Sequence, residues 1–120
     1  MTLVYHGSKE ELKLKNKTSK RYGLVVLFFT TEIRLAKMYA TDTGKIYKVS
    51  LKADKTINFN GQVAHSSRFR NLVFQMSKEG HDVVAIENVF DRPNDSYPFE
   101  KSTIFIVFEM DRIQNLTKCT

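Results

Sequence analysis

The fold of this chain is limited first by its longest apolar run, Leu24–Phe29. Its six residues are far too few for a membrane-spanning helix, which needs about 20, but they suffice for a strand that is buried on both faces. We therefore expect a central strand over Leu24–Thr30. From Thr31 to Ala40 the apolar residues recur three and four positions apart, which predicts a helix that a threonine caps and that ends before Gly44.

The remaining apolar patterns predict further strands and a second helix. The expected strands are Leu3–His6 (ended by Gly7), Lys45–Ala53, Thr56–Phe59, Val83–Val89 and Thr103–Phe108. The segment Ser66–Lys78 has helical spacing, with Ser66 or Ser67 as its cap and Gly80 after its end. Several strands with two unevenly placed helices predict an α+β domain on a mostly antiparallel sheet. The turn-rich segment Asp91–Pro98 is expected to be a loop.

Length and composition fit one globular domain over residues 1–120, with 42% apolar and 27% charged residues. The N-terminus carries no apolar secretory segment and the lone Cys119 fits a reducing compartment, so we expect a cytoplasmic protein. Glycine-rich phosphate loops, nucleophile elbows and paired cysteines are absent from the sequence. The three histidines lack other ligands at metal-binding spacing, so no metal site is expected.

The net charge of +6 is concentrated in Lys9–Arg21, where six basic residues and two acidic residues leave +4. Such a segment attracts anionic partners in a salt-dependent way. Nucleic acid, an acidic protein and a phosphorylated ligand all satisfy that description, and so does a solvated lysine-rich loop without any partner.

Several short pieces of sequence are distinctive when they are taken in order. They are Tyr5-His6-Gly7-Ser8, the run from Gly23 to Thr31, Ala36-Lys37-Met38-Tyr39-Ala40, Gly80–Val89 and Thr103–Glu109. The set resembles the ADP-ribosyltransferase superfamily in its diphtheria-toxin-like branch, which includes the poly(ADP-ribose) polymerases. The eleven-residue step from Phe28 to Tyr39 is similar to that branch's step between its strand tyrosine and its stacking tyrosine. The closing strands resemble those of small phage-borne and polyvalent-protein members.

The resemblance implies a split antiparallel sheet that binds NAD, as a substrate, in a cleft between its two halves. His6 would donate a hydrogen bond to the adenosine ribose, Gly7 would offer its backbone to the nicotinamide amide, and Tyr39 would stack on the pyridine ring. Ser8 would add a ribose contact, and Phe28 and Phe29 an aromatic wall. Structural explanations stand beside these roles, because a strand-end histidine can satisfy a carbonyl, a glycine can form a turn and a tyrosine at helical spacing can be core.

The sequence also departs from the pattern of that branch. Phe28 and Ala36 replace a usual tyrosine and a serine, and Ile104 stands where the polymerase-like members have their catalytic glutamate. Poly(ADP-ribose) synthesis is therefore not expected, whereas rifampicin-modifying enzymes and a phage anti-CRISPR enzyme are similar in length and place their acid elsewhere. Asp91 is the first choice for a relocated acid, with Glu87 and Glu100 as alternatives and Asn88 to position it.

The expected function is accordingly mono-ADP-ribosylation of a macromolecular acceptor, a protein by preference, as small phage-borne members modify host or defence proteins. Two other hypotheses remain open from the sequence. One is a catalytically inactive module that binds NAD or ADP-ribose. The other is a basic nucleic-acid or protein interaction domain that uses only Lys9–Arg21.

Overall fold

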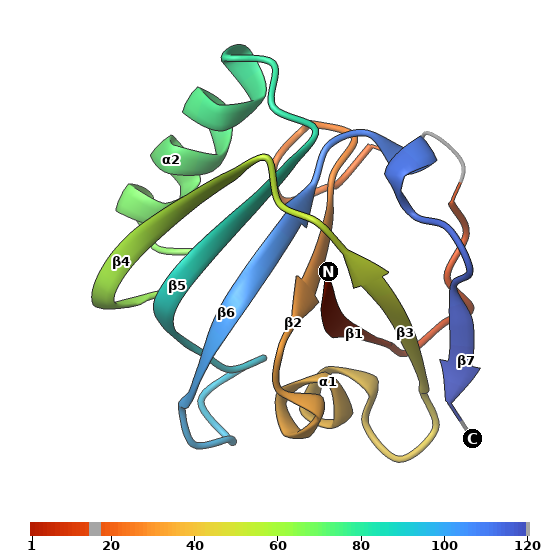
Figure 1. Cartoon of the computed structure of the whole chain (residues 1–120). Helices are drawn as coiled ribbons and strands as arrows, with labels where there is room; N and C mark the ends of the chain where they lie inside the picture. Colours follow the sequence, from red (N-terminus) through yellow and green to blue (C-terminus); the bar gives the residue numbers. More distant parts are fainter. Residues whose placement is uncertain (15–17, 120) are drawn as a thin grey trace.

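A seven-stranded sheet with two helices forms the protein, as seen in a computed structural model that describes residues 1–14 and 18–119 (Figure 1). The elements are β1 (Thr2–Ser8), β2 (Leu27–Thr30), α1 (Ile33–Ala40), β3 (Lys45–Leu51), β4 (Lys55–Val63), α2 (Ser67–Lys78), β5 (Val83–Asp91), β6 (Glu100–Val107), the 3₁₀ turn η1 (Met110–Arg112) and β7 (Thr117–Cys119). The strand order is β4-β5-β6-β2-β1-β3-β7, and only β4 and β5 are parallel. The predicted α+β class with a mostly antiparallel sheet is confirmed.

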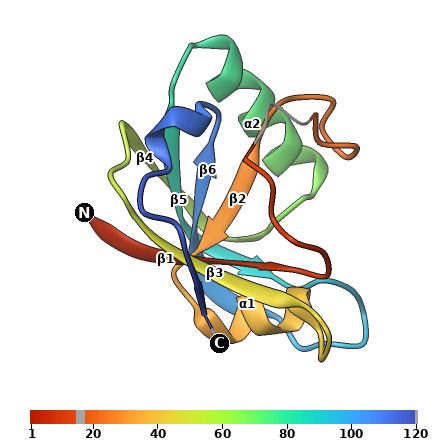
Figure 2. The ribbon, with the colours of Figure 1, turned by 90° about the vertical axis from the view of Figure 1, so that its right-hand side faces the viewer.

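The sheet is nearly divided between β1 and β2. These two strands pair at a single position, Tyr5 with Thr30, whereas β1 and β3 pair along their full length and β2 pairs with β6 at four positions. One half of the sheet therefore holds β4, β5, β6 and β2, and the other holds β1, β3 and β7. Figure 2 shows β1 and β3 running across the direction of β2, β5 and β6.

Two apolar clusters cover the two faces of the larger half. Under α2, the apolar side of the helix packs on alternate residues of β5 and β6; the members include Phe69, Val73, Met76, Val84, Ile86, Ile104 and Ile106. The residues between them point the other way and pack with β1, β2 and β3; the members include Val4, Phe29, Val49, Leu51, Val83, Ala85, Phe105 and Val107. This alternation is what the period of two predicts for strands buried on both faces.

Local signals located the elements, but several boundaries differ from the prediction. Ser66 caps α2 as expected, since its hydroxyl accepts from the backbone N–H of Phe69. The expected threonine cap of α1 is wrong: Glu32 occupies the cap position, and the Thr31 hydroxyl accepts from Thr103 on β6 instead. The Thr31 hydroxyl therefore bonds to a residue on a neighbouring strand and does not cap the helix.

Several strand boundaries differ from the prediction: β3 ends at Leu51, β4 extends over Lys55–Val63, β5 continues to Asp91, and β6 begins at Glu100 and ends at Val107. Asp91, which was expected in a loop, is therefore the last residue of a strand. β2 begins only at Leu27, because the preceding residues turn back and Val25 bridges to Thr18. β1 continues through Gly7 to Ser8, since both residues pair with β3. The short strand β7 was not predicted. Among the described residues, neither helix is long and apolar enough to cross a membrane.

Candidate functional site

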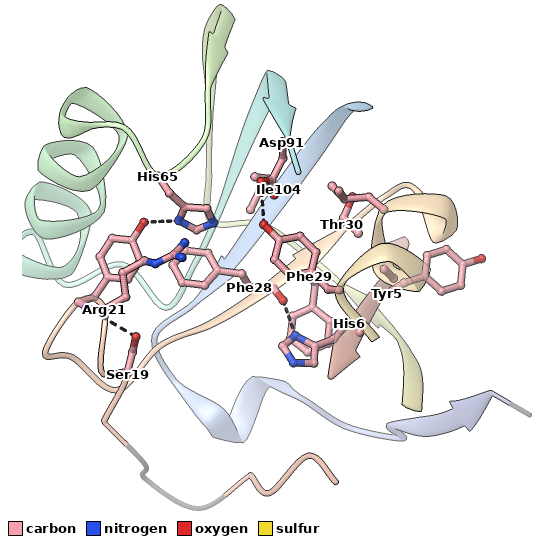
Figure 3. Close-up of a pocket in the computed structure, with 15 residues that line it drawn as sticks. Tyr5, His6, Ser19, Arg21, Phe28, Phe29, Thr30, His65, Asp91 and Ile104 are labelled. Carbon is pink, nitrogen blue, oxygen red and sulfur yellow. Dashed lines mark hydrogen bonds between the residues drawn. The ribbon is translucent and has the colours of Figure 1, made fainter. Parts of the chain in front are cut away.

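A cavity opens where β1 and β2 separate. Its volume is about 240 Å³, and its lining comes from β1, β2, α1, β6, the end of β5 and the loops that precede β2 and α2 (Figure 3). Pockets for drug-sized ligands hold about 300–1,000 Å³, so this one has room for a ring and a sugar rather than a whole dinucleotide. A larger ligand must extend beyond the mouth.

His6 bridges the gap between the two strands. Because Tyr5 faces Thr30, a continued ladder would bring Gly7 opposite Phe28, but no further β1–β2 pair forms among the described residues. Instead, His6 Nδ1 donates a 2.6 Å hydrogen bond to the carbonyl oxygen of Phe28. A carbonyl only accepts, so Nδ1 carries the hydrogen. Burial lowers the pKa of His6 despite the opposing effect of this bond, and Nε2 of the neutral ring is therefore an acceptor.

This tautomer bears on the expected role of His6. The prediction has His6 donate a hydrogen bond to a ribose hydroxyl, whereas with the hydrogen on Nδ1 the other ring nitrogen can only accept. A hydroxyl bound by His6 would have to donate to Nε2, and the contact to ribose stays a prediction. The ring is held in place by its bond to Phe28 and by packing against Phe29, with ring centroids 5.5 Å apart. The simpler explanation, that His6 satisfies a carbonyl, is confirmed by its bond to Phe28.

Gly7 is required for the packing of α1 against β1. A Cβ at this position would lie 1.8 Å from the carbonyl oxygen of Ala36 and 3.0 Å from the backbone nitrogen of Ala40. Gly7 does line the cavity, but the missing Cβ makes room for the helix, whereas we expected it to make room for a nicotinamide. The backbone contact to nicotinamide stays a prediction.

Tyr39 reaches the cavity from the last turn of α1. The side chain is half-buried and borders the cavity, and its hydroxyl donates a 2.7 Å hydrogen bond to Asp91 Oδ1. Burial raises the pKa of Tyr39, and the charge of Asp91 and the hydrogen bond to it raise this pKa further. The hydroxyl therefore stays protonated as a donor to Asp91, and the stacking role of the ring stays a prediction.

Asp91 faces the cavity because β5 contains a bulge. In the first part of β5, even-numbered residues pack under α2 and odd-numbered residues pack on the opposite face. Strict alternation would place both Glu87 and Asp91 on that opposite face. A register shift between Ile86 and Val89, with Asn88 at φ 57°, reverses the alternation. Val89 consequently packs under α2 and Asp91 lines the cavity, while Glu87 stays exposed.

Burial disfavours ionisation of the Asp91 carboxyl group. Only 5% of the residue is exposed, and this burial raises its pKa, whereas the Tyr39 hydroxyl, the backbone N–H of Arg92 and the charge of Arg21 oppose the rise. A poorly solvated carboxylate gains free energy when positive charge develops beside it. The cavity therefore favours a ligand or a transition state that is positive next to Asp91.

The other two acids expected at the site lie outside the cavity lining. Glu87 is exposed on the far side of β5, and Glu100 is paired with Arg34 at 3.6 Å. Ile104 borders the cavity as a buried apolar wall. Among the described residues, Asp91 is the carboxylate that lines the cavity.

Of the remaining residues predicted to contact NAD, some line the cavity and others do not. Phe28 and Phe29 line the cavity, whereas Ser8 and Asn88 do not. The Ser8 hydroxyl accepts from the backbone of Glu10. The Asn88 side chain is hydrogen-bonded to β4, so Asn88 positions Asp91 through the backbone bulge rather than through its amide.

One wall of the cavity was not anticipated from the sequence. The Tyr22 hydroxyl is hydrogen-bonded to Nδ1 of His65, which lies before α2 with φ 60° and packs edge-on against Phe28. Burial raises the pKa of Tyr22 to about 12 and, with the nearby charges of Arg21 and Arg70, lowers the pKa of His65 to about 4. Both side chains are neutral at pH 7. Tyr22 and His65 are 43 residues apart, and no local pattern joins them.

The basic segment reaches the site at its C-terminal end. Ser19 and Arg21 line the cavity, while Lys15 and Lys17 lie outside the described residues. Within residues 1–14 and 18–119, no three His, Cys, Asp or Glu side chains cluster as metal ligands.

Comparisons with protein-family models, with curated proteins and with solved structures found no match to this chain. The structure is an α+β domain with a nearly divided sheet, and the residues of its cavity are the features that bear on function.

Proposed function

We propose that this protein is a mono-ADP-ribosyltransferase that binds NAD in the cavity between β1 and β2 and transfers ADP-ribose to a macromolecular acceptor. The observation that carries the proposal is the convergence of His6, Tyr39 and Asp91 on one cavity. These residues come from β1, α1 and β5. The resemblance in the sequence assigns the first two to NAD, and Asp91 supplies the negative group that the usual position lacks.

The binding roles follow from the groups that face the cavity. The Tyr39 ring stacks on the pyridine ring, and His6 Nε2 accepts a hydrogen bond from a ribose hydroxyl. Phe28 and Phe29 form the apolar boundary. The cavity volume of about 240 Å³ accommodates nicotinamide and its ribose, and the rest of the dinucleotide extends past the mouth.

The reaction itself asks little covalent chemistry of the protein. The bond between ribose C1′ and the pyridine nitrogen breaks, its electron pair leaves with nicotinamide, and the ribose becomes oxocarbenium-like, as in glycoside cleavage. Asp91 stabilises this positive charge. A nucleophile of the acceptor then bonds to C1′ and releases its proton to Asp91 or to water.

A protein is the preferred acceptor, because Lys9–Arg21 reaches the cavity at Arg21 and offers a basic surface for docking. An effector that modifies host or defence proteins would have this organisation. Nucleic acid is the alternative acceptor, and the two differ in which macromolecule retains the label from NAD.

Two observations favour a second candidate, a module that binds NAD or ADP-ribose without turnover. Ile104 supplies no charge to the cavity, and Asp91 is already hydrogen-bonded to Tyr39. Such a module would bind NAD saturably and release no nicotinamide.

The test is nicotinamide release from NAD, together with transfer of labelled ADP-ribose to the components of a cell lysate. Asp91→Asn should lower turnover about 100-fold or more, the scale of losing one electrostatic stabiliser, and leave NAD affinity within a few-fold of wild type. The matched control is Glu87→Gln, which removes an exposed carboxylate from the same strand and should leave turnover unchanged.

Each alternative has its own outcome. Saturable NAD binding without nicotinamide release identifies the binding module. Absence of both, with salt-sensitive retention on nucleic acid, identifies a basic interaction domain and contradicts the proposal. Loss of turnover in Glu87→Gln but not in Asp91→Asn would refute the assignment of the acid.

A further inference from the structure

The cavity lining carries one negative and one positive side chain, and the two lie apart. Asp91 lines the cavity as a buried carboxylate and Arg21 lines it as a guanidinium, and the two are not within ion-pair distance of each other. A pocket that holds opposite charges apart, without neutralising them, is complementary to a ligand that carries both signs at separate places. NAD is such a ligand, since its pyridinium ring is cationic and its diphosphate is anionic.

Arg21 has the position and the freedom to bind an anion. It lies in the turn between Ser19 and Leu24, which two backbone hydrogen bonds close. The residue is exposed, and within the described part of the chain no carboxylate pairs with it. Figure 3 shows its guanidinium directed back toward His65 and Phe28, over the unanticipated wall of the cavity. Its positive charge also lowers the pKa of Asp91 and that of His65, so Arg21 acts electrostatically on both of these cavity residues.

Arg70 adds a second cation behind the same wall. It extends from the first turns of α2 over the ring of Tyr22, with its guanidinium carbon 5.4 Å from the ring centroid. The first turn of α2 carries no acidic residue, and Arg70 has no carboxylate partner among the described residues. Its charge acts on Tyr22 and His65, as that of Arg21 does. Two guanidinium groups from different elements therefore flank the neutral Tyr22–His65 pair.

We infer that Arg21, which lines the cavity, and Arg70, which lies over the Tyr22 ring, form a diphosphate subsite beside the cavity, which fixes the direction in which the dinucleotide enters. The inference rests on the proposed function and deepens it. Guanidinium groups bind phosphate oxygens through paired hydrogen bonds. The nicotinamide riboside portion fills the cavity beside Tyr39 and Asp91, and the phosphates lie outside, where Arg21 is exposed. The subsite thereby places the cationic end of the substrate next to Asp91.

The experiment measures dissociation constants by calorimetry for nicotinamide riboside, NAD and ADP-ribose on the full chain. In the wild type, the two ligands with a diphosphate should bind more tightly, by a margin that falls as salt rises. Arg21→Gln should weaken NAD and ADP-ribose about tenfold, the scale of one charge-assisted hydrogen bond, and leave nicotinamide riboside unchanged. Arg70→Lys should give a smaller loss of the same kind, since it keeps the charge but not the fork. Arg68→Gln is the matched control, an exposed arginine on the same helix whose charge is not among those that act on Tyr22 and His65.

The outcomes separate the subsite from the proposed function. NAD binding that Arg21→Gln leaves unchanged overturns the subsite and leaves the proposed function standing. A wild type that binds ADP-ribose through Arg21 but neither binds nor cleaves NAD overturns the proposed function and supports the subsite. An equal loss in Arg68→Gln and Arg21→Gln shows a diffuse effect of net charge and overturns the subsite. Acceptor phosphate as the true ligand would appear as weaker labelling of the acceptor in Arg21→Gln with unchanged NAD affinity, and this too overturns it.

Discussion

Replacing Gly7 with alanine tests the link between the packing of α1 and the cavity. The added Cβ would lie 1.8 Å from the carbonyl oxygen of Ala36, and ordinary contact begins near 3.4 Å, so α1 must retreat by about 1.6 Å. The opposing atoms belong to the backbone and cannot rotate away. Overpacking of this kind costs about 1–3 kcal/mol, which corresponds to a fall in Tm of about 5–15 °C for a domain of this size. Because α1 carries Tyr39, its retreat also loosens the bond to Asp91.

The assay is thermal denaturation followed by circular dichroism, with NAD affinity measured on the folded variant. Gly80→Ala is the control, because a Cβ there meets nothing within 4 Å and only its φ of +81° opposes the substitution. It should cost about 1 kcal/mol and leave NAD affinity unchanged. A Gly7→Ala protein that melts within a degree or two of wild type and binds NAD normally would refute the reasoning.

Three further predictions concern Asp91 and the residues that position it. Asp91→Asn should stabilise the fold at neutral pH. The pKa of Asp91 is raised in the folded state, so this group favours folding most at low pH, where it is protonated, and the wild type loses that stability as pH rises through the folded pKa. Denaturant unfolding at several acidic pH values should show this loss in the wild type and not in the variant, and parallel plots of unfolding free energy against pH would contradict the prediction. Tyr39→Phe keeps the ring but removes a hydrogen bond that lowers the pKa of Asp91, so the acidic limb of nicotinamide release should move to higher pH, and an unmoved limb counts against Asp91 as the acid. Asn88→Val should cost about 1–2 kcal/mol at φ 57° while Asn88→Gly costs little; equal unfolding midpoints for the two would show that the bulge does not need a left-handed residue.

The sequence predicts those parts of the fold that local patterns determine. The buried strands and α2 follow from apolar spacing, and Ser66 caps α2 because its partner is three residues away. Thr31 is different, since its hydroxyl bonds to a residue 72 positions distant. A capping rule that considers only neighbouring residues has no means of detecting that competitor.

The site shows the same division between local and distant causes. His6 and Tyr39 are found through short motifs, but Asp91 and Glu87 have the same parity along β5, and only the bulge at Asn88 separates them. The pairing of Tyr22 with His65 depends on how two loops meet in space. Arg21 appears in the sequence as one cation among many, and its position over the cavity depends on the turn that precedes β2.

In the proposed function, one cavity binds NAD between an acceptor imidazole and a tyrosine ring. Calorimetric titration of NAD into the wild type and into His6→Ala tests it most directly. We expect saturable binding of one NAD per chain and an affinity about tenfold weaker in the variant, which loses one hydrogen bond to ribose and the anchor on Phe28. A wild type that shows no saturable heat with millimolar NAD, or a His6→Ala protein that binds as tightly as the wild type, would contradict it.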